Sequence, residues 1–177
     1  MINDKIIKND VLAYNEIDHP KTNKLLRILE IFFNDKNVKE LNSKAIIFVE
    51  DRSTIKNIFQ KFESSPLFST LIRATKFLGH DNKKDDQNKM TQKEQQEILK
   101  KFKSGTYNVL ISTCIGEEGL DIGEVDLIIN YDQTNNMTRN IQRRGRTGRQ
   151  RKGFIVNMVV NSSKNKQNFV LGGHEVL

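Results

Sequence analysis

The chain has 177 residues, of which 36% are hydrophobic and 29% charged, so it is long enough for one domain with a sizeable core. Its apolar runs are too short to cross a membrane, and its first residues contain no apolar run typical of a secretory signal. The single cysteine, Cys114, excludes an internal disulfide and is typical of a reducing compartment. The formal net charge of +7 indicates a polyanionic partner, although many basic proteins bind none.

The first predicted element is a helix that begins at Pro20. Proline suits the first turn of a helix, and Asp18 is in a position to cap it. The apolar residues that follow recur at helical spacing and predict a buried face: Leu25, Ile28, Leu29 and Phe32. Residues 1–19 are polar, and we interpret them as an N-terminal extension outside the domain.

The second predicted element is a buried strand, Ala45 to Val49, and a helix over residues 53–62 follows it. Arg52 lies between the two. Parallel sheets bind their ligands at the carboxyl ends of the strands, so Arg52 lies where a ligand would be met. An ordinary surface arginine explains the same residue about as well.

A second strand is predicted over residues 74–79, and a highly charged loop follows it. His80 opens this loop, and no second histidine or cysteine stands at the spacing of a metal site. We therefore expect no metal centre, and we interpret His80 as a loop histidine. Thr91 and Glu94 then form a capping box at the start of a helix that ends before Gly105.

Three further strands are predicted, over residues 107–113, 126–131 and 154–160. Strands that alternate with helices are typical of a parallel sheet covered by helices on both faces, so the fold class is α/β. We place the domain at residues 20–162 and predict a polar tail over residues 163–177.

The most basic stretch is QRRGRTGRQRK, from Gln142 to Lys152. Gly145 and Gly148 each precede an arginine, and the three-residue interval can place Arg146 and Arg149 on one turn. Two guanidinium groups on one face would form a clamp for a polyphosphate. Taken alone, the stretch also fits a solvated basic loop, a nuclear-import signal or a general nucleic-acid patch.

Two segments together favour the polyphosphate interpretation. The run GEEGLDIGEVDLIINYD, followed by QRRGRTGR, resembles motifs V and VI of a superfamily 2 helicase, which belong to the second RecA-like lobe. With TQKEQ at residues 91–95 and motif V extended to STCIGEEGLDIGEVDLII at residues 112–129, the chain is most similar to the FANCM and Hef branch of DNA helicases. DEAD-box RNA helicases usually open the last motif with histidine, and RIG-I-type sensors usually have QTRGRGR there, so Gln142 and Thr147 favour the DNA branch.

The resemblance offers a second interpretation of residues 1–19, as the end of a helical insertion that precedes the second lobe in this family. It covers about residues 20–160 and implies a RecA-like fold and two groups of site residues. For the nucleotide they are Gly119, Asp121, Gln142, Arg146 and Arg149, of which the two arginines are the candidate arginine fingers. For the DNA backbone they are Arg52, His80 and Thr113.

The parts of the first helicase lobe are not found in this sequence. It has no GxxxxGK[ST] phosphate loop and no DExH or DExD box to hold magnesium. We therefore expect ATP with Mg²⁺ to be bound mainly by a first RecA-like lobe of the same polypeptide, and we expect this chain alone to be inactive.

The resemblance implies the second lobe of an ATP-dependent DNA helicase or translocase that acts on forks or junctions in DNA repair. Possible partners are repair-complex proteins, and the location would be nuclear in a eukaryote, otherwise intracellular. Two alternatives remain open: an RNA helicase lobe of the same superfamily, and a non-enzymatic module that only binds nucleic acid or a protein.

Overall fold

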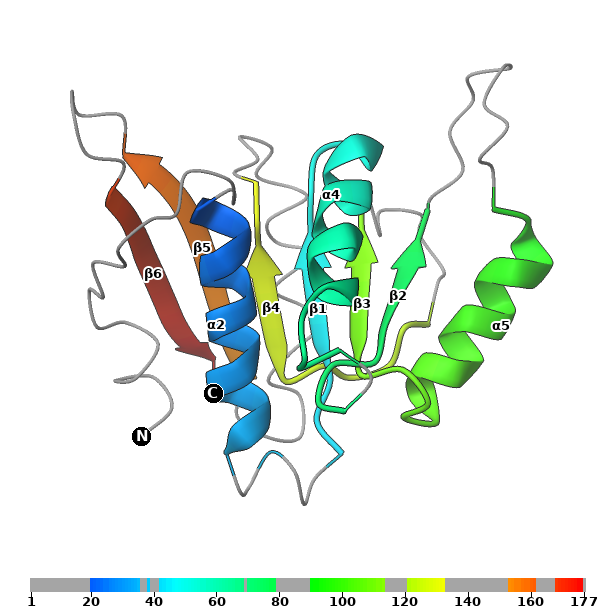
Figure 1. The fold of residues 1–177 in the computed structure, drawn as a ribbon. Helices are drawn as coiled ribbons and strands as arrows, with labels where there is room; N and C mark the ends of the chain where they lie inside the picture. Colours follow the sequence, from blue (N-terminus) through cyan, green and yellow to red (C-terminus); the bar gives the residue numbers. More distant parts are fainter. Residues whose placement is uncertain are drawn as a thin grey trace.

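A computed structural model describes residues 20–35, 38, 42–68, 70–78, 90–113, 121–132, 153–161 and 168–176, the last segment and residues 159–161 as backbone only. Its centre is one six-stranded sheet in the order β2-β3-β1-β4-β5-β6. The strands are β1 (Ala45–Phe48), β2 (Ala74–Phe77), β3 (Val109–Ser112), β4 (Leu127–Asn130), β5 (Gly153–Asn161) and β6 (Asn168–Val176). The first five are mutually parallel and β6 pairs antiparallel with β5 (Figure 1).

Helices cover both faces of this sheet. The helices α2 (Pro20–Asn34) and α4 (Arg52–Glu63) share one apolar core with Ala45 and Ile47 of β1. The helix α5 (Gln92–Lys103) packs on the other face, in a second core with Ile46 and Phe48. Successive side chains of a strand point to opposite faces, so the four buried residues of β1 supply both cores. The predicted α/β class is confirmed.

The helix boundaries follow from local signals. At α5, Thr91 Oγ1 accepts from the Glu94 backbone N–H at 3.2 Å, and Glu94 Oε2 accepts from the Thr91 N–H at 2.7 Å, which confirms the predicted capping box. Gly105 follows the helix with a positive φ of 83°, and a Cβ there would lie 2.4 Å from the Asn42 side chain. Within the described part of the chain, no helix is long and apolar enough to span a membrane.

The strand β6 corrects the predicted polar tail. Its nine residues pair in register with β5, from Asn168 opposite Asn161 to Val176 opposite Gly153. The segment was not predicted as a strand because two adjacent glycines, Gly172 and Gly173, interrupt its apolar residues. What decides its structure is the free edge of β5, whose backbone groups it satisfies. The domain boundaries themselves stay a prediction.

Candidate functional site at the carboxyl edge of the sheet

Three parallel strands end at one level of the sheet. Phe48 of β1 is in register with Ser112 of β3 and with Asn130 of β4. The residues that follow these strands therefore meet along one carboxyl edge, which is where open parallel sheets bind their ligands. We call this line the carboxyl edge; it comprises residues 49–52, Thr113 and residues 131–132.

Arg52 is the first residue of α4, and its side chain is half-buried at this edge. The residue before it, Asp51, is the N-cap: its carboxylate accepts from the Thr54 backbone N–H at 2.9 Å and from the Thr54 hydroxyl at 3.0 Å, and the Ser53 hydroxyl also donates to it. The hydrogen bond from Ser53, followed by that from the Thr54 backbone N–H, lowers the pKa of Asp51 below its ordinary value. These local contacts cap the start of α4, the helix that Arg52 begins.

Asp51→Ala is expected to lower the free energy of unfolding by about 1 kcal/mol through loss of the cap. Asp51→Asn keeps an acceptor but cannot titrate. Because the pKa of Asp51 is lowered in the folded protein, its charge stabilises the fold fully above the pKa that this carboxyl has in the unfolded chain. This contribution disappears as the pH falls through the folded pKa. Urea unfolding from neutral to acid pH checks this. A stability gap between wild type and Asp51→Asn that widens toward acid pH would contradict it.

Thr113 follows β3 directly and is also half-buried. The Val49 N–H donates to the Ser112 carbonyl at 3.0 Å, which ties the segment that leads to Arg52 to the strand that leads to Thr113. The two predicted DNA-backbone residues, Arg52 and Thr113, therefore lie at the same edge of the sheet, each beyond the end of one of two adjacent strands.

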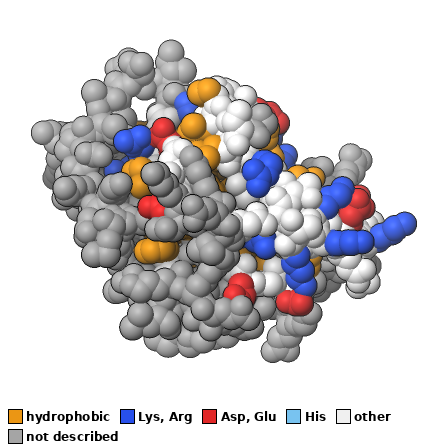
Figure 2. All heavy atoms as spheres, turned by 90° about the horizontal axis from the view of Figure 1, so that it is seen from below, with side chains coloured by type: hydrophobic (Ala, Val, Ile, Leu, Met, Phe, Trp, Pro, Cys, Tyr) orange, Lys and Arg blue, Asp and Glu red, His pale blue; other side chains and the backbone are white. Residues whose placement is uncertain are grey.

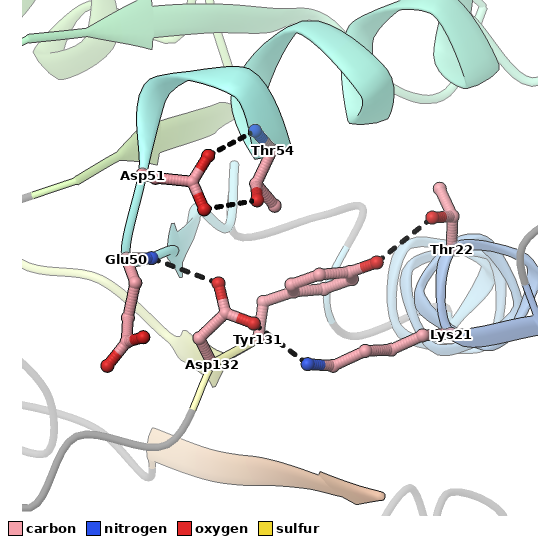
Figure 3. Close-up of polar contacts among 7 residues, drawn as sticks. All are labelled: Lys21, Thr22, Glu50, Asp51, Thr54, Tyr131 and Asp132. Carbon is pink, nitrogen blue, oxygen red and sulfur yellow. Dashed lines mark hydrogen bonds and ion pairs between the residues drawn. The ribbon is translucent and has the colours of Figure 1, made fainter. Parts of the chain in front are cut away.

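A cluster of polar contacts lies at the same edge and was not predicted. Asp132 Oδ1 accepts from Lys21 Nζ at 2.8 Å, and its Oδ2 accepts from the Glu50 N–H at 2.9 Å (Figure 3). The Tyr131 hydroxyl lies 3.0 Å from Thr22 Oγ1, and burial raises the pKa of Tyr131. A charged residue directly after a buried strand, as in the run INYD, is the signal that could have indicated the role of Asp132.

Asp121 lies toward the other end of the strands, where the parallel strands begin. Its carboxylate contacts Lys103 Nζ at 2.5 Å and accepts from the Gly123 N–H at 3.1 Å. Lys103 is the last residue of α5, and its carbonyl accepts from Lys44 Nζ, just before β1 begins. The Asp121 side chain is 81% exposed, which suits an acceptor for a ribose hydroxyl, but Lys103 would have to share it.

The other predicted site residues lie outside the described residues. These are His80, Gly119, Gln142, Arg146 and Arg149. Among the side chains that are described, no group of three or more His, Cys, Asp or Glu residues could hold a metal ion.

The basic surface that is most visible from below belongs to another part of the molecule. Figure 2 looks at the side where the parallel strands begin, and Lys and Arg side chains lie on its right, where Figure 1 has α5. An acidic partner is present on α5 itself, where Lys101 pairs with Glu97 at 2.9 Å. Exposed pairs of this kind describe a solvated helix surface, so we place the candidate site at the carboxyl edge.

Comparison with known families agrees with this geometry. Residues 21–151 match the model of the helicase conserved C-terminal domain. The chain belongs to this family. The predicted identity, a second lobe of a superfamily 2 helicase, is therefore confirmed, and motifs V and VI both lie within the matched residues.

Individual relatives place this helicase domain near the FANCM and Hef branch. It is 38% identical over 189 residues to the ATP-dependent DNA helicase MPH1 of Candida albicans, an alignment that covers 90% of the chain and 16% of that protein. It is 40% identical over 148 residues to the chicken (Gallus gallus) Fanconi anemia group M protein, covering 78% of the chain and 7% of that protein. The chain thus spans a small part of the curated relatives that it matches.

Solved structures confirm the RecA-like fold of the helicase domain. The Hef helicase domain of Pyrococcus furiosus superposes with a TM-score of 0.58 at 36% identity, covering 84% of the chain and 27% of that structure. The C-terminal domain of the DEAD-box protein Dbp5 superposes with a TM-score of 0.60 at 23% identity, covering 82% of the chain and 73% of that structure, a similarity of fold alone.

Proposed function

We propose that the chain is the second lobe of an ATP-dependent DNA helicase or translocase of the FANCM type, which supplies DNA-backbone contacts and arginine fingers for movement on branched DNA. The observation that carries this proposal is the convergence of Arg52 and Thr113 on one carboxyl edge, in a domain whose relatives are named ATP-dependent DNA helicases. Both side chains suit phosphate, which carries no base identity, so the contacts would serve movement along any sequence.

The DNA contacts are of two kinds. Arg52 brings a permanent positive charge and a planar fork of donors that matches phosphate oxygens. Thr113 brings a hydroxyl and a backbone N–H at the end of β3. His80 is proposed as a third, weaker contact from the charged loop.

The nucleotide contacts come from the other group of residues. Gln142 and Asp121 would hold the nucleotide, with Gly119 permitting a close approach, while Arg146 and Arg149 would neutralise the charge that builds on the transferred phosphoryl group. ATP with Mg²⁺ would be held mainly by a first RecA-like lobe of the same polypeptide, and the isolated lobe would not hydrolyse ATP. Closure of the two lobes on ATP and their opening after hydrolysis would shift the grip of Arg52 and Thr113 along the strand.

Forks and junctions are the proposed substrates, and DNA repair in the nucleus of a eukaryotic cell is the proposed setting, with repair-complex proteins as partners. The support is the similarity to a protein named for Fanconi anemia group M and to the DNA helicases named MPH1.

The test uses the complete helicase that contains this chain. Arg52→Ala is expected to raise the DNA concentration that gives half-maximal stimulation of ATP hydrolysis by roughly tenfold, and to reduce the slope of log affinity against log salt by about 1. Thr113→Ala should weaken binding less and leave that salt slope unchanged, because it removes no charge.

Arg27→Ala is the matched control for this test. Arg27 lies on α2 with its guanidinium half exposed and pairs with Glu30 at 2.7 Å, so its loss removes the same charge from a different surface. An equal effect of Arg27→Ala and Arg52→Ala would contradict the proposed contact. Faster unwinding of RNA than DNA duplexes would favour the RNA helicase, and nucleic-acid binding indifferent to ATP would favour the non-enzymatic module.

A further inference from the structure

One carboxylate joins three segments that are far apart in the sequence. Asp132 follows β4, Lys21 lies in the first turn of α2, and Glu50 lies in the loop between β1 and α4. Each oxygen of Asp132 has its own partner: Oδ1 accepts from Lys21 Nζ and Oδ2 from the Glu50 backbone N–H (Figure 3). We call these three residues the Asp132 bridge.

The lysine of this bridge is in an unfavourable place for a cation. Lys21 stands in the first turn of α2, where the helix dipole favours negative charge, and that turn contains no acidic residue. Its side chain is only 11% exposed, and Nζ lies 4.3 Å from the centre of the Tyr131 ring. Asp132 and the face of the Tyr131 ring compensate for its burial. This contact fixes the first turn of α2 to the end of β4.

The Glu50 N–H belongs to the loop that carries Arg52. In this three-residue loop, the Val49 N–H donates to the Ser112 carbonyl, and the Asp51 carboxylate caps α4. The Glu50 N–H is the donor that faces the end of β4, and Asp132 accepts it at 2.9 Å. The Tyr131 N–H also ties this region to β4, by donating to the Phe48 carbonyl at 2.9 Å at the end of β1. The Glu50 bond holds the loop beyond that point, and so contributes to where α4 presents Arg52.

We propose that Asp132 is a positioning residue for nucleic-acid binding: through the Glu50 N–H it holds the loop that places Arg52 at the carboxyl edge, without itself contacting the DNA. The inference rests on the proposed function of Arg52. The two hydrogen bonds of Asp132 have separable roles, because the bond to Glu50 positions the loop and the bond to Lys21 stabilises the attachment of α2 to the sheet.

The experiment removes the two bonds separately in the complete helicase. Lys21→Met replaces the ammonium group by an apolar end and leaves Asp132 free to accept from the Glu50 N–H. It should therefore lower the melting temperature but leave the half-saturating DNA concentration within about twofold of wild type. Asp132→Ala should raise that concentration by roughly tenfold, with the maximal rate of ATP hydrolysis changed by less than about twofold.

A pair of double variants isolates the acceptor for Glu50. In the Lys21→Met background, Asp132→Asn keeps a side-chain oxygen for the Glu50 N–H, whereas Asp132→Ala does not. The asparagine variant should bind DNA nearly as Lys21→Met does, and the alanine variant roughly tenfold more weakly. Asp132→Leu, which keeps the branch at Cγ without an acceptor, takes the place of the alanine variant if that protein does not fold.

The outcomes separate this inference from the proposed function. If wild type shows DNA-stimulated ATP hydrolysis but Asp132→Ala shifts half-saturation no more than Lys21→Met, the positioning role is wrong and the proposed function stands. Equal DNA binding by the two double variants would overturn the role of the Glu50 bond in the same way. If the wild-type helicase shows no DNA-stimulated hydrolysis, the proposed function itself fails.

Discussion

Replacing Arg146 by alanine in the complete helicase is expected to lower the rate of ATP hydrolysis by about a thousandfold or more, with DNA binding retained. The reason is the role proposed for motif VI, in which Arg146 lies beside the phosphoryl group as it leaves and neutralises its growing charge. An interaction made mainly in the transition state lowers kcat more than it raises KM for ATP. Steady-state ATPase kinetics at saturating DNA measure both.

Two variants make the test of Arg146 specific. Arg146→Lys keeps the positive charge but loses the planar fork, so most of the loss in kcat should remain. Arg151→Ala removes an arginine only five positions away that is not a candidate finger, and it should stay within about twofold of wild type. A small effect of Arg146→Ala together with a large effect of Arg149→Ala would assign the finger to Arg149, whereas small effects of both would contradict the proposal.

Phe32→Ala is expected to lower the free energy of unfolding by about 3–5 kcal/mol. Phe32 is fully buried in the core between α2 and the sheet. Its ring meets Phe33 at 5.0 Å and Phe154 at 6.3 Å between centroids, both edge to face. Truncation therefore removes apolar burial, two aromatic contacts and the filling of the space between α2 and β5. Urea unfolding with circular dichroism measures the change.

Phe59→Ala is the matched control for this prediction. It deletes the same side chain from α4 at a half-buried position, where its ring lies 6.4 Å from Phe62 at a tilted angle. Less apolar area is lost and solvent can fill the space, so the cost should be less than about half of that at Phe32. If both substitutions lowered the free energy of unfolding equally, burial against the sheet would not determine the loss of stability.

Most helices and strands could be predicted because their signals are local. The four-residue strand β1 lies inside the predicted apolar run, and α5 begins after the predicted capping box at Thr91. The helix after Arg52 begins one residue earlier than predicted, because Asp51 rather than Arg52 caps it. The strand β6 escaped prediction because its glycines interrupt the apolar pattern and its partner, β5, is recognised only when both are in place.

Some residues of the candidate site could also be predicted from the sequence, whereas their arrangement in space could not. Arg52 and Thr113 could be named because each follows a predicted strand and because open parallel sheets bind ligands where their strands end. That both residues lie at the same level of the sheet depends on the register of β1 with β3. Asp121 shares a motif with Thr113 in the sequence, yet the structure separates the two residues. Thr113 follows the carboxyl end of β3, whereas Asp121 lies before the amino end of β4, a strand that runs in the same direction.

By itself, the sequence determined the fold class, the order of most elements and the two helicase motifs, because periodicity, caps and motifs are properties of neighbouring residues. The tertiary structure alone decided the strand order, the antiparallel edge and the Asp132 bridge. The contacts of that bridge join residues 111 and 82 positions apart. No local pattern specifies such a pair, because a carboxylate finds its partners only after the sheet has brought the distant segments together.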